Sequence, residues 1–253
     1  MNNKKHVCLE LFSGTHSVGK VCRKRGYKVI SVDITDHGGV YIPTFKCDIM
    51  DFNYKKYPKD HFDIIWASPP CRYYSVLQHS WYGRTRIIDN QRVTFTKEIH
   101  DKLMKQDDRL SMKALEIINY FKPKMWFIEN PESSQLKNRE HMKNLPYYTV
   151  SYCHYNFPYR KNTRIWTNVK GFKPKYCRND CDQRVPNTRI HKEDLVKHKK
   201  HLNCVKVRMK HKSEAQGVHK GRGTTRLERY RIPPDLIEEL IKHADTDADI
   251  QNR

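Results

Sequence analysis

The sequence of 253 residues contains no apolar stretch long enough to cross a membrane. The residues that follow segment 1–6 do not form the apolar core of a secretory signal peptide. We therefore expect an intracellular protein, in the cytoplasm or the nucleus, that has no membrane partner. In such a compartment its eight cysteines stay reduced, so a disulfide framework is not expected.

Acidic residues are scarce in this chain. There are 28 Asp and Glu against 49 Lys and Arg, and the formal net charge at pH 7 is +21 with neutral histidines. An excess of this size predicts a polyanionic partner, most simply nucleic acid. The length suits one α/β domain with a small accessory lobe, and a hydrophobic content of 37% is enough for one core. No obligatory protein partner is indicated, and we expect a monomer.

The pattern Gly-x-Gly-x-x-Gly, which binds a pyrophosphate, is also absent. The first segment nevertheless predicts a strand at 7–12, a turn with two glycines at 13–19, a short helix and a second strand at 27–32. Asp33 follows that strand and can accept hydrogen bonds from two ribose hydroxyls. This βαβ unit is typical of nucleotide-binding folds, and the missing pattern favours a nucleoside ligand without a diphosphate.

A third feature lies in the segment 63–75. The apolar run 64–67 follows an acid and stops at Ser68-Pro69-Pro70. Two prolines remove two backbone donors and fix two φ angles, so the pattern predicts a buried parallel strand that ends in a rigid turn. Cys71 then lies at the carboxyl end of a strand, which is where open α/β sheets bind ligands. A thiol there can be a nucleophile if its pKa is lowered.

The remaining chain predicts further elements of the same class. The segment from Arg72 to about Arg109 has the composition of a loop over a site or of an ordinary surface loop. Further strands are expected at 45–48 and 124–128, a pair of strands at 147–155 and 164–167, and helices at 108–121 and from Pro234 onward. The fold class is therefore α/β, with a doubly wound, mostly parallel sheet.

Four segments stand in one order along the chain: Leu-Glu-Leu-Phe-Ser-Gly at 9–14, Ser-Pro-Pro-Cys at 68–71, Glu-Asn-Pro at 129–131 and the basic stretch 160–164. This order resembles the cytosine-5 DNA methyltransferases, especially their small viral and phage members. The Pro-Pro-Cys and Glu-Asn-Pro segments are the most specific pair. The resemblance implies a Rossmann-like methyltransferase that uses S-adenosylmethionine and acts on DNA, in a host cell if the source is viral.

The resemblance also implies roles for individual residues. The target cytosine would be flipped into a pocket, where Cys71 attacks carbon 6 of the ring and carbon 5 takes the methyl group. Glu129 would hold the ring nitrogen and amino group, and Asn130 would position the loop that carries Cys71. Arg160 and Arg164 match the basic motif that contacts the base. The cofactor would contact Phe12, Ser13, Gly14, Asp33, Ile34, Asp48, Ile49 and Pro69.

Several positions depart from the family pattern. Among them, His16 stands where the first motif has a second glycine, and Tyr159 stands where the arginine motif begins with glutamine. Three regions are expected from the resemblance. Residues 1–170 would form the catalytic domain that binds S-adenosylmethionine, 171–226 a small irregular basic lobe that recognises the target, and 227–253 a helix that returns to the catalytic domain.

Other interpretations are open at this point. An RNA cytosine-5 methyltransferase that acts on transfer RNA could share the site, although its Cys-Phe-Thr tripeptide is absent here. A non-catalytic DNA-binding relative would have lost Cys71 or Glu129, and both are present. Cys177, Cys181, His191 and Cys204 are the candidate ligands for zinc. Basic segments rich in histidine and cysteine more often hold no metal, so none is assigned.

Overall fold

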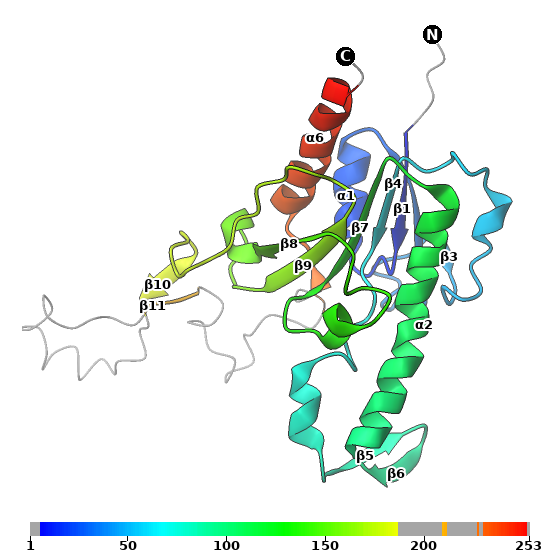
Figure 1. Cartoon of the computed structure of the whole chain (residues 1–253), viewed down its shortest axis with the longest axis vertical. Helices are drawn as coiled ribbons and strands as arrows, with labels where there is room; N and C mark the ends of the chain where they lie inside the picture. Colours follow the sequence, from blue (N-terminus) through cyan, green and yellow to red (C-terminus); the bar gives the residue numbers. More distant parts are fainter. Residues whose placement is uncertain (1–5, 187–208, 212–226, 228–229, 252–253) are drawn as a thin grey trace, which may run out of the picture.

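A seven-stranded sheet forms the centre of the molecule in this computed structural model, which describes residues 6–186, 209–211, 227 and 230–251 (Figure 1). The strands are β1 (Val7–Leu11), β2 (Lys28–Asp33), β3 (Phe45–Lys46), β4 (Ile64–Ala67), β7 (Met125–Pro131), β8 (Tyr147–Ser151) and β9 (Asn162–Thr167). Their order is β3-β2-β1-β4-β7-β9-β8. Neighbours from β3 to β7 pair in parallel, and β9 runs antiparallel to both β7 and β8. The predicted doubly wound, mostly parallel α/β fold is confirmed.

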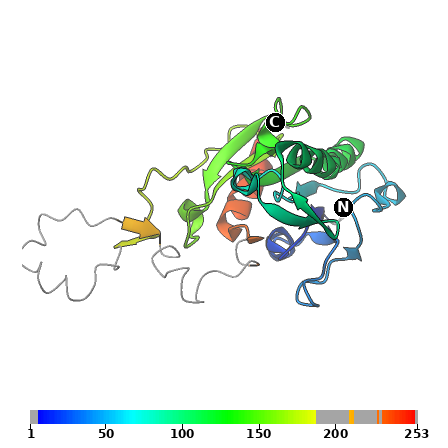
Figure 2. The same cartoon turned by 90° about the horizontal axis from the view of Figure 1, so that it is seen from below.

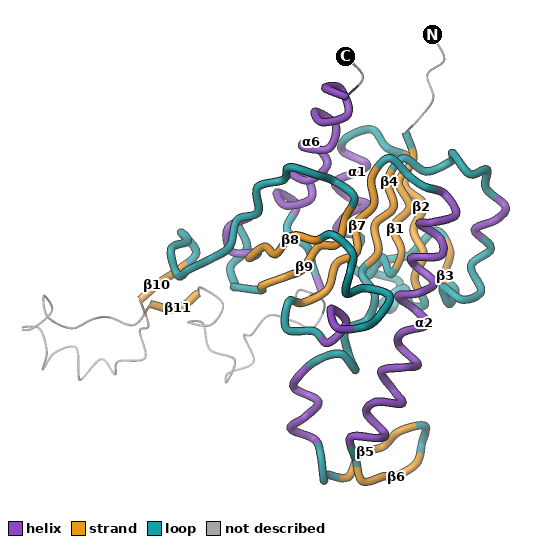
Figure 3. The backbone as a smooth tube through the Cα atoms, in the orientation of Figure 1, coloured by secondary structure: helices purple, strands orange, loops and turns teal. Residues whose placement is uncertain are grey.

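Helices cover both faces of this sheet (Figure 3). They are α1 (Ser17–Lys24), α2 (Lys97–Phe121) and α6 (Pro234–Gln251), with 3-10 turns η1 (Tyr54–Lys56), η2 (Val76–Trp81), η3 (Gln135–Asn138) and η4 (Tyr152–Tyr155). Side chains alternate between the faces along each strand. Trp66 and Phe127 pack in one core with α1 and α6, whereas Ile65 and Ile128 pack in the other with α2. No helix among the described residues is long and apolar enough to span a membrane.

The segment after the Pro-Pro-Cys turn is more regular than the sequence suggests. The helix predicted at 108–121 begins at Lys97, because the Thr96 side chain caps it by accepting the backbone N–H of Ile99 at 3.3 Å. Before it, β5 (Thr85–Ile88) and β6 (Gln91–Thr94) form a hairpin at the end of α2 that lies far from the sheet (Figure 1). Asp89 and Asn90 make its two-residue turn, with φ angles of 49° and 63°.

The basic lobe expected at 171–226 is described only in part. Residues 187–208 and 212–226, including His191 and Cys204, lie outside the described residues. The lobe was expected to be irregular, but it includes one short pair of strands, in which β10 (Arg184–Pro186) pairs antiparallel with β11 (Met209–His211). This pair projects to one side of the central sheet (Figure 2). The three-region division of the chain stays a prediction, although the final helix begins at Pro234 as expected.

Glycine 19 of α1 lies against the buried Glu10 of β1. A Cβ atom at this position would stand 2.6 Å from the Glu10 carboxylate. We predict that Gly19→Ala lowers the free energy of unfolding by about 1–3 kcal/mol despite the higher helix propensity of alanine. Urea denaturation measures the change. Lys24→Ala, at an exposed position of the same helix, is the matched control and should change stability by less than about 0.5 kcal/mol. Equal stability of the two variants would contradict the close contact.

Candidate active site

The turn that carries Cys71 is held by the neighbouring strand. Strands β4 and β7 pair in parallel with Ala67 opposite Ile128, so the residues that follow them meet at the same edge. There the Asn130 side-chain amide donates to the backbone carbonyl of Pro69 at 2.9 Å. Asn130 is 1% exposed, and losing a buried bond of this kind costs roughly 1–3 kcal/mol. The position of Cys71 therefore depends directly on Asn130.

Glu129 precedes Asn130 and is also buried. Its Oε1 atom accepts a hydrogen bond from the Tyr152 hydroxyl at 2.8 Å and one from the Lys161 ammonium at 3.2 Å. A buried carboxylate needs such donors to compensate for the loss of water. Tyr152 belongs to η4 and Lys161 lies just before β9, so the antiparallel end of the sheet orients this carboxylate.

Cys71 lies within the electrostatic influence of this group. Burial raises the pKa of the Cys71 thiol, the Lys161 charge lowers it, and the Glu129 charge raises it, with a net increase. At neutral pH the resting sulfur is thus protonated, because a raised thiol pKa leaves little thiolate. The arrangement provides a half-buried thiol next to a buried carboxylate, with one ammonium that contacts the carboxylate and favours the thiolate.

Asp107 of α2 is a further acid in this region, and it interacts with Arg72 and Tyr73, which follow Cys71 in the chain. Burial raises its pKa to about 6, although the backbone N–H of Tyr73 and the charge of Arg72 act in the opposite direction. One carboxylate oxygen is buried with no hydrogen-bond partner in the described part of the chain. Asp107 therefore changes its protonation in the range between pH 5 and 7, where the other carboxylates of an ordinary protein are already ionised.

The two predicted arginines do not occupy equivalent places. Arg164 stacks on the ring of Tyr147, with its guanidinium carbon 3.7 Å from the ring centroid, and lies opposite Asn130 in the β7–β9 register. Arg160 is exposed and donates to Asn179 at 3.2 Å. The basic side chain that contacts Glu129 is Lys161, which sequence reasoning missed. Tyr159 in place of the expected glutamine was the available sign that the basic motif is displaced in this chain.

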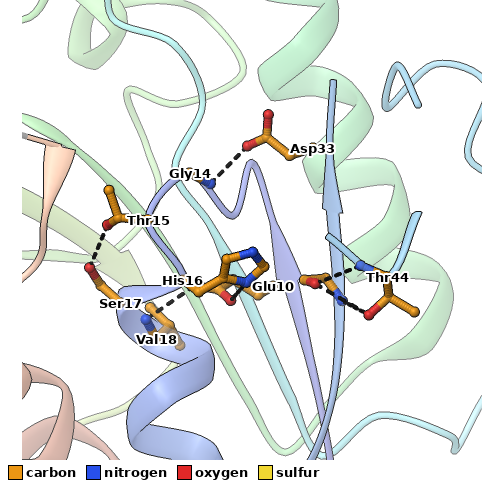
Figure 4. Close-up of polar contacts among 9 residues, drawn as sticks. Glu10, Gly14, Thr15, His16, Ser17, Val18, Asp33 and Thr44 are labelled. Atoms are coloured by element: carbon orange, nitrogen blue, oxygen red, sulfur yellow. Dashed lines mark hydrogen bonds and ion pairs between the residues drawn. The ribbon is translucent and has the colours of Figure 1, made fainter. Parts of the chain in front are cut away.

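Four of the predicted cofactor residues, Phe12, Ser13, Gly14 and Asp33, lie at the carboxyl edge of β1 and β2, where Figure 4 shows Gly14 and Asp33. Phe12 directly follows β1 with a left-handed φ of 56°, which turns the chain so that the Ser13 amide donates to the Val32 carbonyl at 3.1 Å. The Gly14 amide donates to the Asp33 carboxylate at 2.8 Å, and the Thr35 amide donates to its other oxygen at 2.9 Å. Each carboxylate oxygen keeps a further lone pair for a ligand.

Beneath this turn lies a buried pair of polar side chains (Figure 4). Glu10 accepts the amide of Val18 at 3.0 Å, at the start of α1, and its other oxygen is 3.7 Å from Nδ1 of His16. Both ring nitrogens of His16 and the hydroxyl of Ser13 are buried without a hydrogen-bond partner within the described ranges. Such orphaned polar atoms next to a glycine turn fit a bound polar ligand, because an unsatisfied buried group is costly.

The other predicted cofactor residues lie near the ends of neighbouring strands. Ile34 follows β2 and is 68% exposed, whereas Ile49 is buried. Asp48 lies two residues beyond β3, and its carboxylate accepts the amide of Met50 at 2.9 Å. Pro69 is buried beside Asn130. These placements follow the edge expected from the sequence, and the contacts with a cofactor stay predictions.

Comparison with known proteins gives two informative similarities. The chain is 37% identical over 237 residues to a frog virus 3 (isolate Goorha) protein named "Probable DNA (cytosine-5)-methyltransferase", covering 92% of this chain and 97% of the relative. It is 12% identical to a solved methyltransferase of Entamoeba histolytica, with a TM-score of 0.52 over 96% of this chain and 99% of that one. The second similarity concerns the fold alone.

A solved protein of an E. coli prophage, assigned as a DNA modification methyltransferase, is 16% identical over 64% of this chain, with a TM-score of 0.44. The chain spans 46% of that protein. No protein-family model matches the sequence.

The contact between Lys161 and Glu129 gives a prediction about Cys71. We predict that Lys161→Met slows alkylation of Cys71 by iodoacetamide at pH 7.5 by about 3- to 10-fold, because removal of the cation reduces the thiolate fraction. Peptide mass mapping of Cys71 measures the rate. Arg160→Met removes a neighbouring positive charge that bonds Asn179 instead and is the matched control. If both variants slowed the alkylation of Cys71 equally, the effect would come from the loss of net charge and not from the contact between Lys161 and Glu129.

Proposed function

The chain belongs to the DNA (cytosine-5)-methyltransferase family, and from this premise we propose that it transfers a methyl group from S-adenosylmethionine to carbon 5 of a cytosine in DNA. The observation that carries the proposal is the hydrogen bond from the Asn130 side chain to the Pro69 carbonyl, which joins the turn that carries Cys71 to the strand end that carries Glu129. A nucleophile and a carboxylate at one strand edge are the groups that covalent catalysis on a pyrimidine requires.

Cys71 is the proposed nucleophile. Its sulfur attacks carbon 6 of a cytosine that has been flipped out of the duplex, and the electron pair moves toward carbon 5. Because burial raises the pKa of the thiol, the thiol must pass its proton to water as the base binds, and the Lys161 charge favours the thiolate that remains. Asn130 keeps the sulfur in position through the Pro69 carbonyl. Removal of the proton on carbon 5 later releases the thiol.

Glu129 is the proposed acid that stabilises charge in the ring. It would bind the ring nitrogen and the exocyclic amino group and so support the electrons that the attack pushes into the ring. Tyr152 and Lys161 both donate to Oε1 of Glu129, which leaves Oε2 for the base. Arg164 lies on the same edge and is the nearer of the two predicted arginines to Asn130, so we assign it rather than Arg160 to the base.

S-adenosylmethionine is the proposed cofactor, and it supplies an electrophilic methyl group when bound. Asp33 would accept hydrogen bonds from the ribose hydroxyls through the lone pairs that Gly14 and Thr35 leave unused. The orphaned polar atoms of Ser13 and His16 would bind the amino-acid part of the molecule. The buried carboxylate of Glu10 favours a ligand that carries positive charge nearby.

DNA is the proposed partner, because a net charge of +21 favours a polyanion. The segment 72–96, with η2 and the β5–β6 hairpin, extends beyond the edge that carries Cys71 (Figure 1). On it Arg84 and Arg92 are exposed, and Trp81 is 41% exposed with the Arg86 guanidinium 5.0 Å from its ring centroid. We propose that this arm contacts phosphates and bases near the flipped cytosine, and that the lobe 171–226 contributes target recognition.

Methylation of nucleic acid tests the reaction. The native chain with S-adenosylmethionine should methylate duplex DNA, read by bisulfite sequencing, at a rate that falls steeply as salt rises. Cys71→Ser should reduce the rate by at least about a thousandfold, because serine is a far weaker nucleophile at neutral pH. The same variant should bind S-adenosylmethionine with unchanged affinity, which controls for folding. Methylation of transfer RNA but not of DNA would replace DNA as the substrate, and full activity of the variant would contradict the covalent route.

Cofactor affinity tests the assignment of Asp33. We predict that Asp33→Ala raises the Kd for S-adenosylmethionine by about 10- to 100-fold in calorimetry, because hydrogen bonds to a charged group are lost. Asp36→Ala is the control, since Asp36 lies in the same loop and pairs with the exposed Lys46. An unchanged Kd for Asp33→Ala would remove Asp33 from the cofactor site.

A further inference from the structure

Three cysteines outside the proposed active site lie together. Cys153 of η4 and the loop residues Cys177 and Cys181 are 3%, 1% and 8% exposed. Their sulfur atoms all lie within 4.8 Å of one another, and none of the three forms a disulfide. They form a small cluster separate from the two cores of the sheet. Neither the methyl-transfer mechanism nor the similarity to known proteins uses this cluster.

A fourth donor stands next to it. The imidazole of His154, the sulfur of Cys177 and a carboxylate oxygen of Asp180 also lie within 4.8 Å of one another. Nε2 of His154 is 3.1 Å from Asp180. Histidine that binds a metal is often oriented by a carboxylate. The imidazole therefore lies within reach of one of the three thiols, Cys177, and the candidate ligands come from η4 and from the loop that holds Cys177 and Cys181.

We propose that Cys153, Cys177, Cys181 and His154 bind one zinc ion. Zinc prefers four ligands of this kind in a tetrahedron with Zn–S bonds of about 2.3 Å, which separates the sulfur atoms by about 3.8 Å. The three sulfur atoms lie within 4.8 Å of one another, so each pair needs to move by at most about 1 Å to reach that value. A disulfide would use two of the three thiols and leave one, whereas a metal ion uses all three.

The site would join the loop that leads into the basic lobe to the strand end that supports Glu129. The Cys177 amide donates to the Ser151 hydroxyl at 3.0 Å, and the Ser151 amide donates to the Lys175 carbonyl at 2.9 Å. Tyr152, which donates to Glu129, lies between Ser151 and Cys153. A zinc ion at Cys153 would thus fix the turn from which Tyr152 reaches the active site. Its role is structural, since all four positions are filled by the protein.

Metal content tests the proposal independently of methyl transfer. The full chain, purified from cells supplied with zinc and passed through metal-free buffer, should contain about one zinc per chain by mass spectrometry of the metal. Cys177→Ser should reduce this to less than about 0.2. Cys47→Ser, which removes a half-buried thiol outside the cluster, should leave it unchanged. Two results would overturn the site: a native chain that holds less than about 0.2 zinc per chain after incubation with a zinc salt, or a Cys177→Ser variant that holds as much zinc as the native chain.

Cobalt titration of the native chain keeps the test valid if the serine variant does not fold. Co²⁺ should give an intense sulfur-to-cobalt charge-transfer band that zinc then abolishes, and absence of the band would overturn binding by the thiols. His154→Ala should keep the band with a cobalt Kd about 10- to 100-fold higher. An unchanged Kd would remove His154 from the ligand set. If the chain contains no zinc after purification with zinc supplied and still methylates DNA, the metal site is contradicted and the proposed reaction is not.

Discussion

The parallel pairing of β4 with β7 is the constraint on which the candidate active site depends. It places Ala67 beside Ile128, and the two strands end at the same edge. The Pro69-Pro70 turn then fixes where Cys71 stands, and the Asn130 side chain holds that turn through the Pro69 carbonyl. A register shift of one residue in β7 would move Glu129 and Asn130 each to the face of the sheet opposite the one it occupies now. The buried strands 64–67 and 125–128 therefore specify the chemistry as well as the core.

The antiparallel end of the sheet orients the carboxylate of Glu129. Strand β9 and the η4 turn bring Lys161 and Tyr152 to the same oxygen of Glu129. Without these donors the buried carboxylate would lack the hydrogen bonds that compensate for its loss of water. The same end of the sheet leads through Cys177 and Cys181 to the basic lobe. The proposed metal site and the orientation of Glu129 thus involve neighbouring residues of one turn.

Most of the sheet and the carboxyl edge that carries the site could be predicted from the sequence. Buried strands such as 64–67 are continuous apolar runs, and the acids, glycines and prolines that follow them mark one edge. Lys161 could not be found in this way, because the family motif led to Arg160 and only the pairing of β9 places side chains at Glu129. Cys153 was missed for a similar reason, since it is distant in sequence from Cys177 and η4 brings it close. Helix α2 begins earlier than predicted because the Thr96 side chain caps it. The β5–β6 hairpin forms because Asp89 and Asn90 adopt left-handed φ angles in its turn. Both local signals lie in a polar segment, whose composition resembles that of a loop.

The central claim is that the Cys71 sulfur bonds to a cytosine held beside Glu129. A duplex that contains 5-fluorocytosine tests it most directly, because fluorine on carbon 5 cannot leave as a proton and the covalent adduct persists after methyl transfer. The account predicts a protein–DNA adduct, dependent on S-adenosylmethionine, whose proteolytic map places the cross-link on Cys71. An adduct on another cysteine, or methylation of ordinary cytosine by a chain that forms no adduct with the fluorinated duplex, would contradict it.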